Sequence, residues 1–152
     1  MINKLSIATT TGSYSAYLAI PRVQKGPGLL VLPEIYNSNH HIRSVADQFA
    51  DAGFLSLAPD VFWRIRSECY LPYTADGLQN AREMNQELDV NQLINDLGVA
   101  LETLGNREMF RPRWLCRVLF RREIIVPVCC TARSSGSCEL LWSQHRKLLR
   151  RS

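Results

Sequence analysis

Two short apolar runs on either side of one helical segment constrain the fold of this chain more than any other feature. The first run, Leu29–Leu32, is bounded by glycine and proline and is too short for a helix. Apolar residues then recur at helical spacing from Ile42 to Ala50, and Gly53 follows as a helix terminator. A second apolar run covers residues 54–58. Strand, helix and strand within about 30 residues predict a right-handed parallel unit and an α/β fold.

Reactive groups in parallel sheets gather just past the carboxyl ends of the strands. In this chain those places are Pro33-Glu34-Ile35 and Pro59-Asp60. From position alone, Glu34 is more often a solvated carboxylate than a catalytic one, and Asp60 after a proline is more often a turn former. His40 and His41 stand at a helix start, where we expect surface residues.

Further elements are expected on both sides of this unit. Residues 4–7 and 13–20 alternate around Thr11-Gly12 and predict a hairpin. Residues 63–74 predict an excursion over the strand ends, followed by helices over 75–88 and 89–104. The second helix requires another strand after it, yet the residues that follow show no clear period. We therefore expect an irregular tail, with a weak helix over 140–149.

The charge of the chain changes abruptly near residue 105. Residues 1–105 hold 7 Lys+Arg and 11 Asp+Glu, a net charge of −4, whereas residues 106–152 hold 11 Lys+Arg and 3 Asp+Glu, a net charge of +8. Four of the five cysteines also lie in this second part. One domain rarely changes character so sharply, so we expect a domain over 1–108 and a basic Cys/Arg-rich tail over 109–152 that is disordered.

Composition also bounds the location of the protein. No apolar run reaches the length of about 18 residues that a membrane span needs, so we expect no membrane contact. The N-terminus has no apolar signal core, which predicts a cytoplasmic protein with reduced cysteines.

The segments Leu32-Pro33-Glu34-Ile35-Tyr36, His41-Ile42-Arg43, Ala52-Gly53-Phe54 and Ala58-Pro59-Asp60-Val61-Phe62-Trp63-Arg64 resemble the dienelactone hydrolase (carboxymethylenebutenolidase) family of α/β-hydrolases. The likeness covers roughly residues 1–108 and is specific as a set. One departure is Asn37, where many members have glycine.

The resemblance implies a chemistry. Family members hydrolyse lactones and related esters through a Cys-His-Asp triad, with the cysteine in a Gly-Tyr-Cys-x-Gly-Gly elbow, and need no metal or organic cofactor. By this resemblance, Glu34 matches the glutamate that interacts with the resting nucleophile. The backbone N–H of Ile35 matches one donor of the oxyanion hole, where preorganised N–H groups stabilise the tetrahedral intermediate.

The elbow itself is missing: no Gly-x-Ser-x-Gly or Gly-x-Cys-x-Gly occurs in the sequence. Codons that can encode Val118–Glu123, when read one base later, can give Tyr-Cys-Phe-Gly-Gly-Lys. We therefore hypothesise a shift of reading frame between about Met109 and Arg113, with the nucleophile codon straddling Leu119 and Phe120. The central strand of the family, its elbow and the later Asp and His would then be absent, and the chain would be an inactive, truncated hydrolase.

Two other interpretations compete with this one. In the first, the chain is a non-enzymatic binding protein whose basic tail contacts nucleic acid or another anionic partner. The tail has no known nucleic-acid-binding pattern, so we do not expect nucleic acid as a partner. In the second, the tail cysteines and a histidine bind zinc, although their spacing fits no common finger; those residues are Cys116, Cys129, Cys130, Cys138 and His145.

Overall fold

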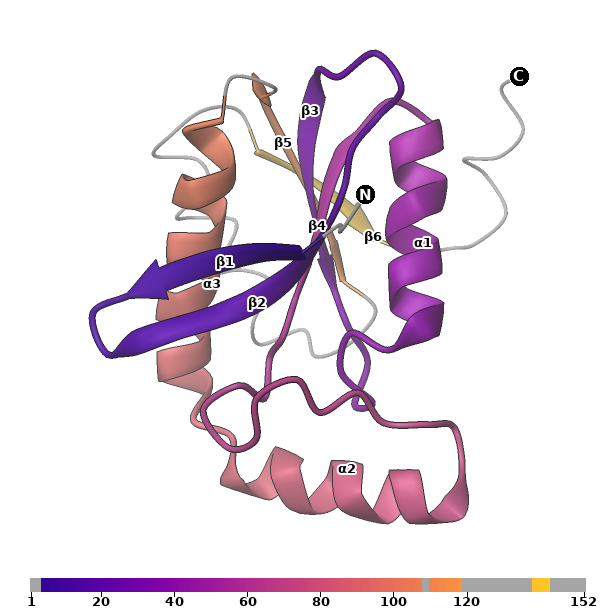
Figure 1. Cartoon of the computed structure of the whole chain (residues 1–152), viewed down its shortest axis with the longest axis vertical. Coiled ribbons are helices and arrows are strands. Elements are labelled where there is room, and N and C mark those ends of the chain that lie inside the picture. Colours follow the sequence, from indigo (N-terminus) through magenta and orange to yellow (C-terminus); the bar gives the residue numbers. More distant parts are fainter. Residues whose placement is uncertain (1–3, 108–109, 119–137, 143–152) are drawn as a thin grey trace.

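The computed structural model describes residues 4–107, 110–118 and 138–142, which form one six-stranded sheet with helices on both faces (Figure 1). The strand order is β1-β2-β4-β3-β5-β6. The strands are β1 (Lys4–Thr9), β2 (Gly12–Ala19), β3 (Gly26–Leu32), β4 (Leu55–Pro59), β5 (Phe110–Val118) and β6 (Cys138–Trp142). The helices are α1 (His40–Asp51), α2 (Ala75–Glu87) and α3 (Val90–Gly105).

The predicted hairpin and parallel unit are confirmed. β1 and β2 pair antiparallel around the predicted turn, and β2 pairs antiparallel with β4. β3 and β4 are parallel neighbours, with Leu30 opposite Leu57. α1 connects them and ends as expected, because Gly53 has a φ of +96° and its N–H donates to Ala50 O at 2.9 Å.

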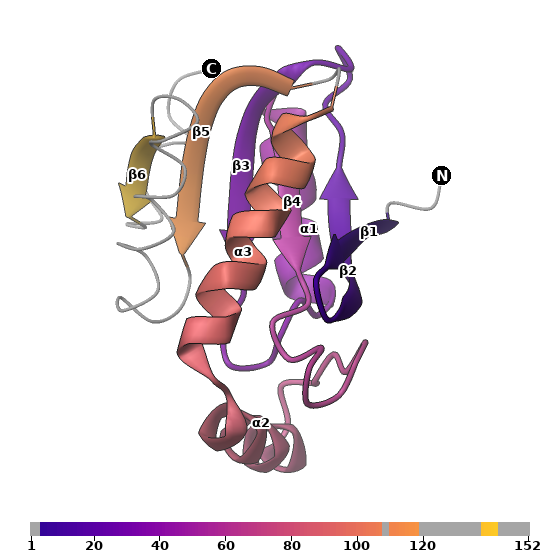
Figure 2. The same cartoon turned by 90° about the vertical axis from the view of Figure 1, so that its left-hand side faces the viewer.

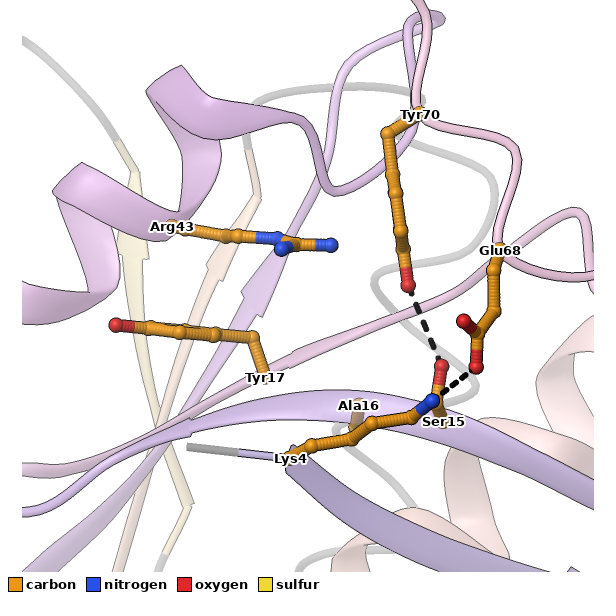
Figure 3. Close-up of a pocket in the computed structure, with 7 residues that line it drawn as sticks. All are labelled: Lys4, Ser15, Ala16, Tyr17, Arg43, Glu68 and Tyr70. Atoms are coloured by element: carbon orange, nitrogen blue, oxygen red, sulfur yellow. Dashed lines mark hydrogen bonds and ion pairs between the residues drawn. The ribbon is translucent and has the colours of Figure 1, made fainter. Parts of the chain in front are cut away.

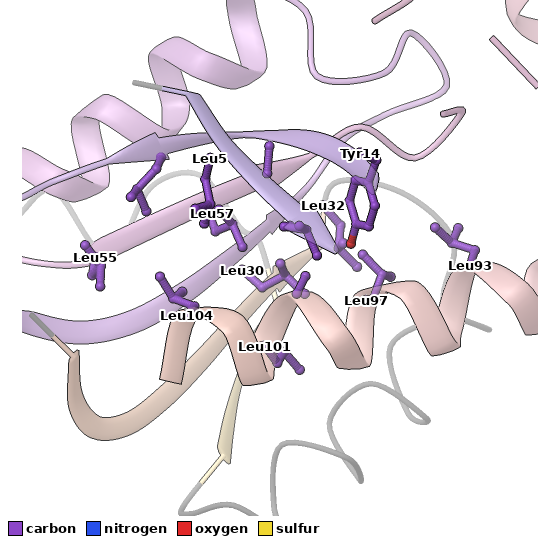
Figure 4. Packing of buried hydrophobic residues seen from close by; sticks show 14 residues of the cluster. Leu5, Tyr14, Leu30, Leu32, Leu55, Leu57, Leu93, Leu97, Leu101 and Leu104 are labelled. Carbon is purple, nitrogen blue, oxygen red and sulfur yellow. The ribbon is translucent and has the colours of Figure 1, made fainter. Parts of the chain in front are cut away.

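Alternate side chains of the sheet point to two separate cores. Figure 2 shows α3 on one face of the sheet and α1 on the other. Leu30 and Leu57 pack with α3 on one face, where Leu97 and Leu101 lie among them (Figure 4). On the other face, Leu29 and Val31 pack with α1. β3 is therefore buried on both sides, which explains its unbroken apolar sequence.

β5 and β6 correct part of the expectation for the tail. β5 pairs parallel with β3, and β6 pairs parallel with β5. The expectation of an irregular tail is therefore wrong over residues 110–118 and 138–142, and α3 is followed by the strand that its position requires. The expected weak helix over 140–149 is also wrong at 140–142, which lie in β6. β3 is apolar on both faces, and β4 pairs with only one of its edges. The N–H and C=O groups on the other edge need partners, and β5 supplies them although its own sequence has no strand pattern.

The rest of the tail lies outside the described residues, and so do Cys129, Cys130 and His145 of the zinc interpretation. Cys116 lies in β5 and Cys138 in β6. Within the described ranges, no helix is both long enough and apolar enough to cross a bilayer.

Candidate active site

A tight turn takes the chain from the carboxyl end of β3 to the start of α1. The Asn37 N–H donates to Glu34 O at 3.1 Å, which closes the turn. Asn37 has a φ of +63°, a left-handed conformation that asparagine and glycine tolerate better than other residues. This conformation explains how asparagine can stand where many similar sequences have glycine.

The Asn37 side chain joins this turn to the carboxyl end of β4. It is fully buried, and its Nδ2 donates to Asp60 Oδ1 at 2.6 Å and to Cys69 O at 3.0 Å. Its Oδ1 accepts from the Val61 N–H at 3.0 Å. An asparagine that uses both polar atoms in this way fixes the exits of two adjacent strands relative to each other.

Ser38 and Asn39 continue the same connection, so that three consecutive polar side chains are buried. Ser38 Oγ donates to Pro59 O at 2.5 Å. Asn39 caps α1 by accepting from the Ile42 N–H at 3.2 Å, and its Nδ2 donates to Leu71 O at 3.2 Å. We call residues 37–39 the polar bridge. The sequence indicated only a helix cap here.

Asp60 accepts hydrogen bonds both from Asn37 of the polar bridge and from the loop after β4. It is 2% exposed, and its carboxylate also accepts from the N–H groups of Phe62 at 3.1 Å and Glu68 at 2.7 Å. Burial raises the pKa of Asp60, although the hydrogen bonds from Asn37, Glu68 and Phe62 oppose this effect. These bonds give Asp60 the structural, turn-forming role that its sequence position favoured.

Glu34 lies half-buried at the carboxyl end of β3, where one contact orients it. Tyr73 Oη donates to Glu34 Oε2 at 3.3 Å. The Tyr73 ring also lies against Tyr36, with centroids 4.5 Å apart. Burial raises the pKa of the Tyr73 phenol, and the Glu34 carboxylate adds to the rise. The phenol therefore keeps its proton at neutral pH and is the hydrogen-bond donor toward Glu34.

Ile35 follows Glu34 in the turn and is half-buried beside the small core of α2. Its N–H donates to no backbone carbonyl in the described part of the chain. β5 ends in register with this edge, since Val118 lies opposite Leu32. Three features therefore meet at one edge: a carboxylate, an N–H donor and the carboxyl end of the next strand.

The two histidines have the surface positions that were expected. His40 and His41 are both exposed in the first turn of α1. His41 makes an edge contact with the Tyr73 ring, with centroids 6.1 Å apart.

Tyr73 and the bridging role of Asn37 were missed by sequence reasoning. The signal for Tyr73 was present, because residues 63–74 were expected to pass over the strand ends. The bonds from Asn37 to Cys69 and from Asn39 to Leu71 confirm that path. Which aromatic of this segment meets Glu34 depends on the loop conformation, which carries no periodic pattern.

A family model described as the dienelactone hydrolase family matches residues 14–112. A protein of Azospirillum brasilense named as a carboxymethylenebutenolidase is 46% identical over 54 residues, which are 35% of this chain and 23% of that protein. Carboxymethylenebutenolidase 1 of Cupriavidus pinatubonensis is 27% identical over 92 residues, which are 60% of this chain and 39% of that protein. The chain thus spans less than half the length of these relatives.

Solved structures support the fold. A dienelactone hydrolase-like promiscuous phosphotriesterase from metagenomic libraries superposes with a TM-score of 0.64 at 17% identity. The match covers 92% of this chain and 57% of that structure. The arrangement of strands and helices is therefore that of an α/β-hydrolase.

Proposed function

This chain belongs to the dienelactone hydrolase family, and from that premise we propose that it carries one half of an ester- or lactone-hydrolysing site and is inactive by itself. The half that it carries is the edge formed by Glu34 and the N–H of Ile35. The half that it lacks is the triad of nucleophilic Cys, Asp and His. The observation that carries the proposal is the meeting of the Glu34 turn with the carboxyl end of β5.

The reaction of an intact relative explains what these groups would do. A thiolate attacks the carbonyl carbon of the ester, a C–S bond forms, and the carbonyl oxygen becomes an oxyanion. An N–H at the position of Ile35 would donate to that oxyanion. The C–O bond then breaks, and the alcohol oxygen takes the proton that the thiol had given to the histidine of the triad. Water then hydrolyses the thioester, so that its hydroxyl enters the acid and its other proton restores the thiol.

Glu34 would act before substrate binds, by accepting a hydrogen bond from the resting thiol. The contact with Tyr73 supports this role, because a phenol that donates to one carboxylate oxygen leaves the other available. No metal or organic cofactor enters any of these steps.

The missing half is best explained by a shift of reading frame between Met109 and Arg113. The family match ends at residue 112, within this interval, although 40 residues follow it. The change of net charge, near residue 105, lies just before this interval, and the first of the four tail cysteines, Cys116, lies just after it. The elbow of the shifted frame would begin where β5 ends, at Val118.

The test compares the 152-residue chain with a product in which one base is removed from the natural coding DNA between those codons. We expect no hydrolysis of p-nitrophenyl acetate by the 152-residue chain. We expect turnover by the restored product, and iodoacetamide should abolish it. Turnover by the 152-residue chain that a thiol reagent removes would overturn the proposal, as would a restored frame without Tyr-Cys-x-Gly-Gly.

A further inference from the structure

A cavity that is separate from the Glu34 edge lies between the hairpin, α1 and the loop after β4 (Figure 3). Its volume is about 250 Å³, slightly below the usual range of about 300–1,000 Å³ for drug-sized ligands, so it suits a small molecule. Neither Glu34 nor Ile35 lines it. The side chains that form its walls are Lys4, Ser15, Tyr17, Arg43, Glu68 and Tyr70.

Arg43 is held in a fixed plane at this cavity. Its Nε donates to Ser38 O at 2.9 Å, which ties it to the polar bridge. Its guanidinium carbon lies 4.0 Å from the centroid of the Tyr70 ring and 5.7 Å from that of Tyr17. The N–H donors of a guanidinium lie in the plane of the group. Stacking on aromatic rings therefore leaves the donors at its edge available for hydrogen bonds.

That edge is not used by the described part of the protein. No hydrogen bond or ion pair from Nη1 or Nη2 of Arg43 occurs among the described residues. Glu68, the carboxylate of the cavity, is instead engaged by Lys4 in an exposed ion pair. The pKa of Glu68 is lowered, chiefly by its hydrogen bond from Lys4, so Glu68 is ionised at neutral pH.

The charges and shapes of the walls define the ligand class. The described residues that line the cavity include two cations and one carboxylate, a net charge of +1, which favours a ligand with a single negative charge. The planar fork of Arg43 matches a carboxylate in bidentate geometry. The rings of Tyr17 and Tyr70 provide flat apolar surface beside it. We propose that this cavity binds a small monocarboxylate with a flat aromatic or conjugated body.

The test titrates benzoate into the 152-residue chain and follows binding by saturation-transfer NMR and calorimetry. We expect saturable binding of one benzoate per chain and no comparable binding of benzamide, which has the same shape without the charge. Arg43→Gln should weaken benzoate binding by about tenfold or more, because it removes the charged fork. Arg22→Gln, a change at an exposed arginine elsewhere, should leave it unchanged.

A second variant separates a binding role from a folding role. Glu68→Gln removes the one carboxylate among the described residues that line the cavity and should strengthen benzoate binding several-fold, an increase that damage to the fold cannot produce. Circular dichroism of each variant establishes that the chain is folded. Equal binding of benzamide, equal losses in Arg22→Gln and Arg43→Gln, or absence of saturable benzoate binding to the folded chain would each overturn the proposal. None of these outcomes depends on ester hydrolysis.

Discussion

At the scale of single residues, Asn37 combines two demands that rarely fall on one side chain. Its backbone is left-handed, and its side chain makes three hydrogen bonds in a fully buried place. Glycine meets the first demand only, and alanine meets neither. The sequence could reveal only that Asn37 replaces a common glycine, since the partners of its side chain lie 23 to 32 residues away.

We expect Asn37→Gly to lower the free energy of unfolding by about 1–3 kcal/mol, because buried donors and acceptors lose their partners. Asn37→Ala should cost about 1–2 kcal/mol more through left-handed strain. Urea unfolding measures both. Gln24→Gly is the matched control: Gln24 has a φ of +57° but is exposed and makes no side-chain hydrogen bond in the described chain, so stability should be unchanged or slightly raised. Equal losses at both sites would refute this account.

Asp60 gives a prediction about pH. Its folded-state pKa is raised above the ordinary value of 3.8, so the folded protein binds the proton more tightly than the unfolded chain. The contribution of Asp60 to stability is therefore greatest below pH 3.8 and falls as the pH rises through the folded-state pKa. As the pH rises from about 3 to about 7, the free energy of unfolding of the wild type should therefore fall relative to that of Asp60→Asn. Chemical unfolding of both proteins at both pH values measures this change. A rise in the free energy of unfolding of the wild type relative to that of Asp60→Asn would contradict the prediction.

At the scale of elements, a buried carboxylate on α3 anchors the loop after β4. Asp96 is 4% exposed and accepts from Trp63 Nε1, Arg64 Nε and Arg64 Nη2, each at 2.8 Å. Arg64 also reaches the hairpin, where its Nη1 donates to Thr11 Oγ1 at 2.9 Å. The family motif that ends in Trp63-Arg64 thus ties a helix, a loop and a hairpin together.

Arg64→Ala should destabilise the protein by about 1–3 kcal/mol, since Asp96 would remain buried with fewer charged partners. Arg66→Ala, two residues along the same loop, is the control, because Arg66 is exposed and makes no side-chain bond in the described residues. Thermal unfolding followed by circular dichroism compares the two. A loss in Arg66→Ala as large as that in Arg64→Ala would show that the loop, rather than this ion pair, is responsible.

Elements with periodic sequence were predicted well, and those without it were not. α1 and α3 carry apolar residues at helical spacing, and each lies within a few residues of its predicted bounds. β5 reads Phe-Arg-Pro-Arg-Trp-Leu-Cys-Arg-Val and shows no such pattern. Its place next to β3 follows from the unpaired edge of that strand, which is a tertiary demand and cannot be read within the segment itself.

At the scale of the whole molecule, protection from solvent falls from the middle of the sheet to the hairpin. β3 has neighbours on both edges and a helix layer on both faces, and Leu29, Leu30 and Val31 are completely buried. β1 forms one edge of the sheet, and Lys4, Ser6 and Ala8 are exposed. Local opening therefore frees β1 at lower energy than β3.

Hydrogen–deuterium exchange followed by mass spectrometry should show the slowest amides in peptides that cover β3. Peptides that cover β1 should exchange fastest among the strands from β1 to β4. Peptides that cover β4 serve as the internal comparison, because this strand is also buried but has the hairpin as one neighbour. Protection of β1 equal to that of β3 would contradict the proposed gradient.

The polar bridge has a consequence for the order in which the molecule is made. Every described hydrogen-bond partner of Asn37, Ser38, Asn39 and Asp60 lies between Ser15 and Tyr73. A nascent polypeptide can therefore lock these two loops while β5 is still inside the ribosomal exit tunnel. A change of reading frame between Met109 and Arg113 would then leave the loops of the first half able to fold normally.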